Sequence, residues 1–243
     1  MGEDIIDIMP IYIPQRRYSL GFLFLGHKVN IPEATKKWRD FMYTLNRESW
    51  NTRVMVKISV LSVIAFILMF FEFALVWLAP PFMKLDISDL PALIGAFAIG
   101  PMAGVIIELL KNLLNLLIEG STTGGVGELA NFVVGAAFVY SAGFIYYKSK
   151  TFKSAIIGLA VGTIVMTVVI SIANYYVMFP FYAKLFGMKI EDLVSMGTQI
   201  NSKIVDMKAM VIYAIVPFNI LKGIVLSALT ILIYKRVSPI LHK

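Results

Sequence analysis

The sequence predicts an all-α integral membrane protein, a bundle of six transmembrane helices. Its 243 residues are 58% hydrophobic and only 15% charged, with a mean hydropathy of +0.79, whereas soluble domains are about 45–50% apolar. The apolar residues form continuous runs, several of which reach the roughly 20 residues that a helix needs to cross a bilayer. The basic residues lie mostly at the ends of these runs, as is typical of membrane spans. The lipid bilayer is therefore the expected environment.

Prolines, glycines and charged residues divide the apolar sequence into helices. We expect six, near residues 54–77, 89–99, 101–118, 128–147, 153–179 and 209–236. The second is short, and IGPMAG at 99–104 predicts a tight Gly-Pro turn before the third. The second and third helices are thus expected to form a hairpin that is partly re-entrant or strongly tilted.

The distribution of Lys and Arg predicts the orientation of these helices. With six spans, three basic clusters fall on the same side of the membrane: Arg47, Arg53 and Lys57; Lys148, Lys150 and Lys153; Lys235, Arg236 and Lys243. Because basic loops favour the cytoplasm, both termini are expected to be cytoplasmic. The segments 78–88, 119–127 and 180–208 then face outside.

Composition also narrows the function. Residues 1–50 are a polar N-terminal extension whose role the sequence does not reveal, and residues 51–243 form the membrane domain. The net charge of +7 does not indicate nucleic-acid binding, because the basic residues are scattered at helix ends. No catalytic or metal-binding motif is predicted: Cys is absent, His27 and His242 lie in polar ends, and neither HExxH nor GxSxG occurs.

The segment VPFNILKG at 216–223 interrupts the last apolar run with polar residues. Asn219 and Lys222 are three residues apart, so they share one face of the helix. Ionisable residues inside a membrane are candidates for a functional site, and Pro217 is expected to bend the helix beside them. The alternative is a packing pair, with Asn219 bonded to a neighbouring helix and Lys222 snorkelling or paired with an acid.

A second candidate site lies near the outer end of the fifth helix. Asn174 is followed by a group of aromatic residues: Tyr175, Tyr176, Phe179, Phe181 and Tyr182. Aromatic rings can stack on a flat heteroaromatic ligand while a carboxamide reads its polar edge. The tyrosines are equally typical of an interfacial aromatic belt.

Two loops on the predicted outer side are further candidates. The segment 78–91 carries three prolines with Phe82, Lys84, Asp86 and Asp89, and is either a lid over a pocket or a rigid turn. The segment GSTTGGVG at 120–127 lacks the Lys-Ser/Thr of a phosphate loop, so ATP binding is not expected. Gly127 allows either close approach of a ligand or simple flexibility.

The third helix carries Glu108 and Lys111 at a spacing of three, together with Asn112 and Asn115. An internal ion pair between Glu108 and Lys111 is the simplest interpretation of that spacing.

From about Val54 to Lys243 the chain resembles the riboflavin-specific substrate-binding (S) components of bacterial energy-coupling factor (ECF) vitamin transporters. The resemblance extends through LSVIAFIL, PPFMKLDISDLPALIGAFAIGPMAG, LLKNLLN, ELANFVVGAAF, IVMTVVISIANYYVMFPFY and VPFNILKG. It implies six spans, cytoplasmic termini, a bacterial plasma-membrane location and no enzymatic activity. It also implies partners: a T component and two ATP-binding subunits that drive uptake.

The resemblance further implies a flavin site on the outer side of the membrane. Carried over by position, the residues around riboflavin are Phe82, Lys84, Gly127, Asn174, Asn219 and Lys222. The family more often has a small hydroxyl residue at the position of Lys84, and a cation there could favour the phosphorylated flavin FMN. Riboflavin or FMN is thus the expected transported ligand, and no separate cofactor is expected.

S components of this kind also carry a small-xxx-small pattern on the first helix, where the T component docks. The candidate residues here are Ser59 and Val63, with Ser62 and Ala65 nearby. A stand-alone secondary transporter for a flat aromatic metabolite remains the alternative function, although no internal repeat supports it.

Overall fold

The computed structural model describes residues 51–80, 83–121 and 123–241. The predicted polar extension, residues 1–50, lies outside the described residues. The helices are α2 (Thr52–Met69), α3 (Asp89–Ala98), α4 (Pro101–Ile118), α5 (Val126–Ser149), α6 (Phe152–Ala173), α7 (Phe179–Leu185), α8 (Ile190–Thr198), α9 (Met207–Met210) and α10 (Val216–Leu241). Two π-helical turns, η1 (Asn174–Met178) and η2 (Val211–Ile215), and two short strands, β1 (Phe73–Ala74) and β2 (Lys84–Leu85), complete the described elements.

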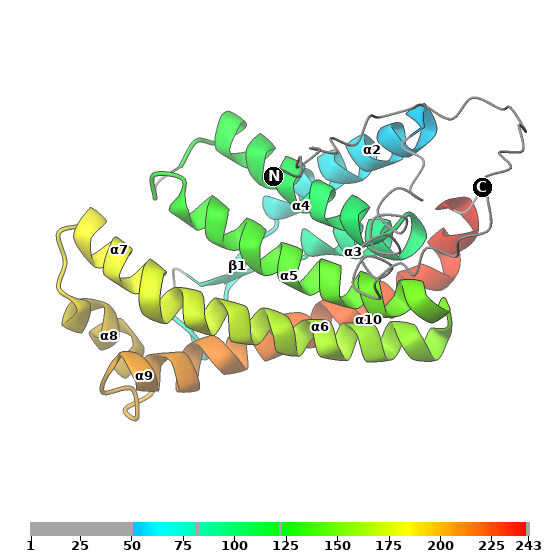
Figure 1. Cartoon of the computed structure of the whole chain (residues 1–243). Coiled ribbons are helices and arrows are strands. Elements are labelled where there is room, and N and C mark those ends of the chain that lie inside the picture. The colour runs from blue at the N-terminus through cyan, green and yellow to red at the C-terminus, as the bar shows by residue number, and fades with distance from the viewer. Residues whose placement is uncertain (1–50, 81–82, 122, 242–243) are drawn as a thin grey trace, which may run out of the picture. The chain divides into compact units, whose positions relative to one another are not determined.

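The long helices α5, α6 and α10 run side by side along the bundle (Figure 1). Glycines allow this close approach. A Cβ on Gly158 would lie 2.6 Å from the Ala142 carbonyl oxygen, and one on Gly223 would lie 2.4 Å from the Thr163 side chain. Small residues at such positions let helix backbones approach in a membrane, where lipid is as apolar as the helix surface.

The predicted turn between the second and third helices is confirmed. Gly100 has φ 155°, a backbone conformation that residues with a Cβ rarely adopt, and Pro101 is the first residue of α4. The ten residues of α3 are almost all buried, and the helix is too short to cross a bilayer by itself. Five described helical segments are long and apolar enough to span a membrane.

The first helix is shorter than predicted. It ends at Met69 instead of continuing to residue 77, and Phe73 and Ala74 pair antiparallel with Leu85 and Lys84. Sequence hydropathy misses this end because residues 70–77 are apolar apart from Glu72. Glu72 forms an ion pair with Lys84 beside the strands, so the segment returns along the ribbon and does not extend the helix.

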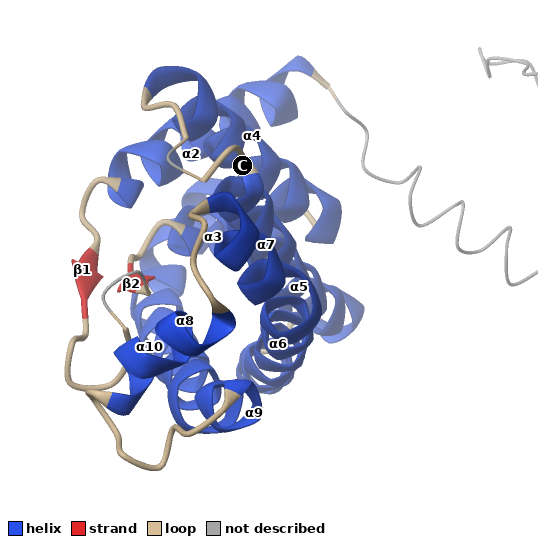
Figure 2. Ribbon diagram, turned by 90° about the vertical axis from the view of Figure 1, so that its left-hand side faces the viewer, coloured by secondary structure: helices blue, strands red, loops and turns tan. Residues whose placement is uncertain are grey.

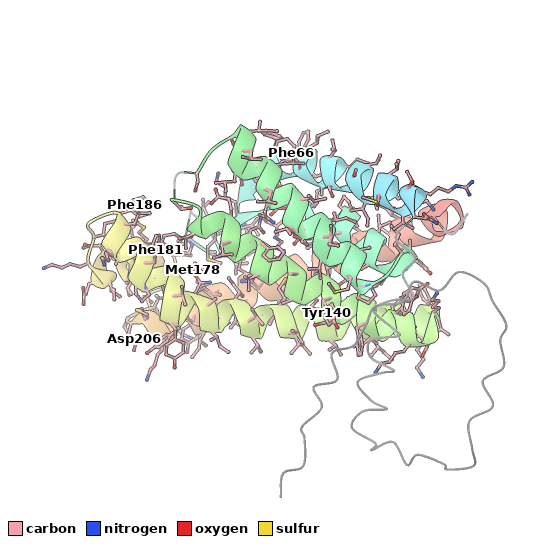
Figure 3. All side chains as sticks on the ribbon, turned by 45° about the horizontal axis from the view of Figure 1, so that its top comes forward. Phe66, Tyr140, Met178, Phe181, Phe186 and Asp206 are labelled. Carbon is pink, nitrogen blue, oxygen red and sulfur yellow. The ribbon has the colours of Figure 1, made fainter. Side chains whose placement is uncertain are left out.

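The long segment 180–208 is structured at one end of the bundle. There α7, α8 and α9 gather beyond the C-terminal end of α6 and the N-terminal end of α10 (Figures 1 and 2). Their own small core includes Phe179, Leu193, Ile204 and Met210. We call this region, residues 179–210, the cap. Figure 3 places Phe181 and Phe186 in the cap, and Asp206 just before α9.

The two π turns occur at matching places on α6 and α10. Each turn contains the residue four positions before a proline: Tyr176 before Pro180, and Tyr213 before Pro217. A proline in an α-helix lacks the N–H for that residue's carbonyl and its ring clashes with it. The wider π turn removes this conflict, which refines the predicted bend at Pro217. Single π turns inside α-helices are frequent at functional sites.

Candidate functional site

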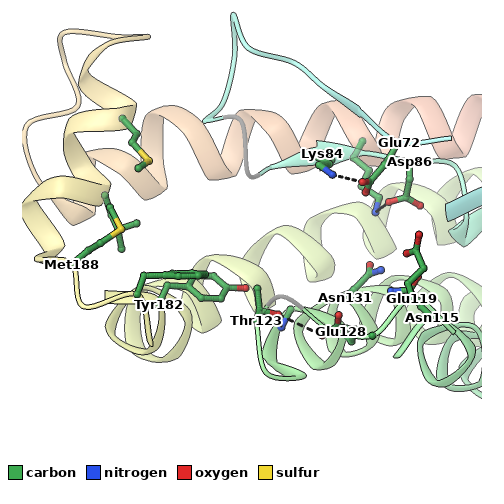
Figure 4. Close-up of a pocket in the computed structure, with 16 residues that line it drawn as sticks. Glu72, Lys84, Asp86, Asn115, Glu119, Thr123, Glu128, Asn131, Tyr182 and Met188 are labelled. Carbon is green, nitrogen blue, oxygen red and sulfur yellow. Dashed lines mark hydrogen bonds and ion pairs between the residues drawn. The ribbon is translucent and has the colours of Figure 1, made fainter. Parts of the chain in front are cut away.

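One cavity of about 1080 Å³ lies between the β1–β2 ribbon, the Gly-rich loop that joins α4 to α5, the cap helices and α10 (Figure 4). Its volume is slightly above the roughly 300–1,000 Å³ typical of small-molecule sites. Sixteen residues line it: Glu72, Lys84, Asp86, Asn115, Glu119, Gly120, Thr123, Gly127, Glu128, Asn131, Tyr182, Phe186, Met188, Leu193, Met196 and Lys222. Apolar and aromatic residues come from the cap, whereas the charged residues come from the other elements.

Lys222 reaches the cavity from α10 and is 6% exposed. Its Nζ lies 3.2 Å from Asp86 Oδ2 and 3.1 Å from Asp89 Oδ2. Burial by itself raises the pKa of the Asp86 carboxyl, but the Lys222 and Lys111 ammonium groups and the hydrogen bond from Ser88 together outweigh it, so the pKa lies below its ordinary value. Two carboxylates therefore hold one ammonium group at the edge of the cavity.

Asp89 connects this pair to a deeper one. Its Oδ1 accepts a hydrogen bond from Lys111, which also lies 2.9 Å from Glu108 Oε2. Asp89, Glu108 and Lys111 are all fully buried. The predicted pair between Glu108 and Lys111 is thus confirmed, within a chain of alternating charges that runs from Glu108 to Asp86.

Ser88 and Gly135 complete the surroundings of this buried charge network, which we define as Asp86, Asp89, Glu108, Lys111 and Lys222. The Ser88 backbone N–H and hydroxyl donate to Asp86, and Lys111 Nζ lies 2.9 Å from Ser88 Oγ. A Cβ on Gly135 would lie 2.2 Å from Glu108 Oε2, so a larger residue would displace that carboxylate from its present position. Buried charges need such partners, because removing one partner costs about 3–5 kcal/mol.

Lys84 also has a partner of its own. It forms an ion pair with Glu72 across the β1–β2 ribbon, and both side chains are about half exposed. Both lysines that line the cavity, Lys84 and Lys222, therefore form ion pairs with carboxylates.

In the Gly-rich loop, side-chain hydroxyls bind the backbone N–H groups. Ser121 Oγ accepts from the N–H groups of Thr123 and Gly125, and Thr123 Oγ1 accepts from that of Gly127, at 2.8–3.2 Å. Ser121 also donates to Glu128 Oε2 at 2.8 Å. Positive φ angles at Gly120, Gly124 and Gly125 explain the glycines of this loop.

The structure brings together only part of the predicted ligand set. Lys84, Gly127 and Lys222 line the cavity. Asn174 and Asn219 do not: each donates its side-chain amide to the carbonyl one helical turn earlier, Ile170 and Ile215 respectively. Phe82 lies outside the described residues.

The predicted docking residues on α2 do not share one exposed face. Ser59 and Val63 are exposed, whereas Ser62 is 2% exposed and Ala65 is fully buried. The reason is helical spacing: Ser62 and Ala65 face α3 and α4, against which α2 packs. This corrects the expectation that all four residues are available to a partner.

Several lining residues were not singled out in the sequence. Glu119, Glu128 and Asn131 flank the Gly-rich loop, and Phe186 follows the predicted aromatic group. The only sequence signal for these residues is that they lie next to the Gly-rich loop or the aromatic group, which were already candidate sites. Glu72 gave none, because it lies in a segment predicted as helix.

Comparison with known proteins identifies the family. Residues 53–234 match the family described as ECF transporter, substrate-specific component. The chain belongs to this family. It is therefore a transport subunit and a multi-pass membrane protein. Its S-component fold is also that of a solved structure of the S component of a bacterial ECF transporter, which is 40% identical, with a TM-score of 0.61, covering 79% of this chain and 98% of that one.

Individual relatives are also similar to this S component over most of their length. The riboflavin transporter RibU of Staphylococcus aureus is 42% identical, covering 78% of this chain and 92% of the relative. The riboflavin transporter FmnP of Bacillus subtilis is 36% identical, covering 78% and 94%. RibU of Streptococcus thermophilus is 32% identical, covering 91% and 98%.

Proposed function

We propose that this S component captures riboflavin on the outer side of the membrane and releases it inward together with an ECF module. The module comprises a T component and two ATP-binding subunits, which carry out ATP hydrolysis. One observation carries the proposal: the cavity with Lys222 on its edge lies within residues 53–234, which match the S-component family, and a relative named as a riboflavin transporter is similar over 78% of this chain.

The chemistry of the cavity suits a flavin. Tyr182 and Phe186 offer aromatic faces, and Met188, Leu193 and Met196 offer apolar contacts at the same end. A flavin ring has an apolar benzenoid end and a polar edge with carbonyl oxygens and one N–H. Lys222 donates to that edge, and Asp86 beside it accepts.

We assign the other predicted residues supporting roles. Gly127 permits close approach of the ligand to the start of α5, and Lys84 lies on the ribbon that borders the cavity. For Asn174 or Asn219 to bind the ligand, its amide must exchange the bond to the helix carbonyl for one to flavin. Their positions beside the two π turns favour such local adjustment.

Binding is tested by titrating the purified full-length protein in detergent with riboflavin and following the quenching of flavin fluorescence. We expect saturable binding at one site per chain. Thiamine, a vitamin without a flavin ring, serves as the control competitor and should not displace riboflavin. Absence of saturable riboflavin binding by monodisperse protein would contradict the proposal.

Energy coupling is tested by riboflavin uptake in cells that express the chain with or without the T component and the ATP-binding subunits. Uptake should require all of them, whereas a secondary transporter would work alone. On α2, exchange of exposed Val63 for arginine should reduce uptake and leave binding intact. In contrast, Ser62→Leu and Ala65→Leu should impair folding, because both side chains are buried.

A further inference from the structure

Six charged side chains line the cavity, and they are unequally divided by sign. Four are carboxylates, on Glu72, Asp86, Glu119 and Glu128, and two are ammonium groups, on Lys84 and Lys222. We name Glu72, Lys84, Asp86 and Lys222 the paired wall, because each of them has an ion-pair partner. We name Glu119 and Glu128 the acidic wall. In Figure 4, Glu72, Lys84 and Asp86 lie along the upper side of the cavity, and Glu119 and Glu128 lie along its lower side.

Among the described residues, no cation forms an ion pair with the acidic wall. Glu128 accepts hydrogen bonds from the hydroxyl of Ser121, at 2.8 Å, and more weakly from that of Thr123, at 3.4 Å. Glu119 is an exposed residue at the C-terminal end of α4, where the helix dipole adds further negative potential. The acidic wall therefore contributes two uncompensated negative charges.

The Gly-rich loop does not offset these charges as an anion site. A loop of this kind at a helix N-terminus binds phosphate through free backbone N–H groups. Here the N–H groups of Thr123, Gly125 and Gly127 are bound by the loop's own hydroxyls. The Glu128 carboxylate occupies the first turn of α5, which is the place that a phosphate would favour.

We propose that the acidic wall makes the cavity select riboflavin over phosphorylated flavins, with Glu119 and Glu128 as the residues that determine this selectivity. The inference rests on the proposed function. FMN differs from riboflavin by a terminal phosphate that carries about −1.5 to −2 charges at pH 7. If the tail follows the acidic wall, the phosphate meets carboxylates. If it follows the paired wall, the phosphate meets two ammonium groups whose charge is already balanced by carboxylates. Specificity thus arises from repulsion of the wrong ligand.

The experiment compares the dissociation constants of riboflavin and FMN for the purified full-length protein by fluorescence titration. Wild type should bind FMN at least about tenfold more weakly than riboflavin. The double variant Glu119→Gln/Glu128→Gln keeps side-chain size and removes both charges. It should reduce the ratio of the two constants by at least about fivefold, mainly through tighter FMN binding. Exposed Glu191 lies outside the cavity lining, so Glu191→Gln should leave the ratio unchanged.

A measurement on wild type alone gives an independent check. Because part of the repulsion acts through solvent, raising the salt concentration should weaken the preference for riboflavin. Equal affinities for the two flavins in wild type, or a double variant that weakens both equally, would overturn the inference while leaving riboflavin capture intact. Failure to bind riboflavin at all would instead overturn the proposed function, and the inference with it.

Discussion

The paired wall and the acidic wall border the same cavity but balance their charges by different means. On the paired wall, Asp86 and Lys222 are almost fully buried, and each lies within ion-pair distance of an opposite charge. On the acidic wall, Glu119 is exposed, and Glu128 is partly buried and bonded to a hydroxyl. Water and neutral hydrogen-bond donors can stabilise a carboxylate near the surface, whereas a buried charged group needs a partner of opposite charge.

Substitutions in the two walls should therefore differ in how strongly they affect folding. The paired wall continues inward through Asp89 to Lys111 and Glu108, so a change there reaches the packing of α3 against α4. The acidic wall has no such continuation among the described residues. Four substitutions test this difference between the two walls.

The largest effect is expected at Asp89, which lies between two ammonium groups. Asp89→Asn keeps the shape and removes the charge that both Lys111 and Lys222 use. We expect a loss of about 3–5 kcal/mol in the free energy of unfolding, seen as a lower melting temperature in detergent. The exposed control Glu191→Gln should melt like wild type. A native melting temperature for Asp89→Asn would show that the buried charge network is not needed for stability.

Lys222→Met should weaken riboflavin binding, and it should also lower the melting temperature because buried Asp86 and Asp89 lose an ammonium partner. The substitution keeps the volume of the side-chain stem and removes the ammonium group. Losing a hydrogen bond to a charged group costs about 1.5–3 kcal/mol, so riboflavin should bind about ten- to a hundredfold more weakly. Fluorescence titration measures this, with exposed Lys184→Met as the matched control. Unchanged affinity in Lys222→Met would reduce Lys222 to a packing residue.

Gly135→Ala tests the deep end of the buried charge network. The added Cβ would lie 2.2 Å from Glu108 Oε2, and overpacking of this kind costs about 1–3 kcal/mol. Thermal unfolding measures the loss. In a Glu108→Ala background the same substitution should cost nothing further, because the clash is gone. Additive losses in the double variant would mean that Gly135 matters for another reason.

Lys84→Thr should have the smallest effect. Its pair with Glu72 is about half exposed on both sides, and exposed ion pairs contribute about 0–1 kcal/mol. Melting temperature and riboflavin affinity should stay close to the wild-type values. Selective loss of FMN binding in this variant would instead assign Lys84 to the phosphate, against the role inferred for the acidic wall.

Much of the architecture followed from the sequence, because local signals determine it. The Gly100–Pro101 turn and the Glu108–Lys111 pair depend on residues one to three positions apart. Hydropathy placed the main helices because the bilayer sets their length. The early end of α2 was missed because its cause, the pairing of Phe73–Ala74 with Lys84–Leu85, involves a second segment.

The site was less predictable, since its contacts join distant parts of the chain. Lys222 was a candidate because a charge inside an apolar run is visible in sequence, but its partner Asp86 lies 136 positions away. Asp86 and Asp89 were visible only as members of a candidate loop, because the lysines that they bind lie on other helices. The amide bonds of Asn174 and Asn219 to their own helices depend on side-chain conformation, which composition and spacing do not specify.

The two π turns also have a consequence for how α6 and α10 tolerate length changes. A π turn holds one residue more than an α turn, so each helix carries a one-residue insertion matched to its proline. One residue corresponds to about 100° of rotation around a helix. Deleting a single residue from 174–178 would therefore turn Tyr182 away from the cavity. Tyr182 would keep its place only if Pro180 were replaced and the helix around it rewound.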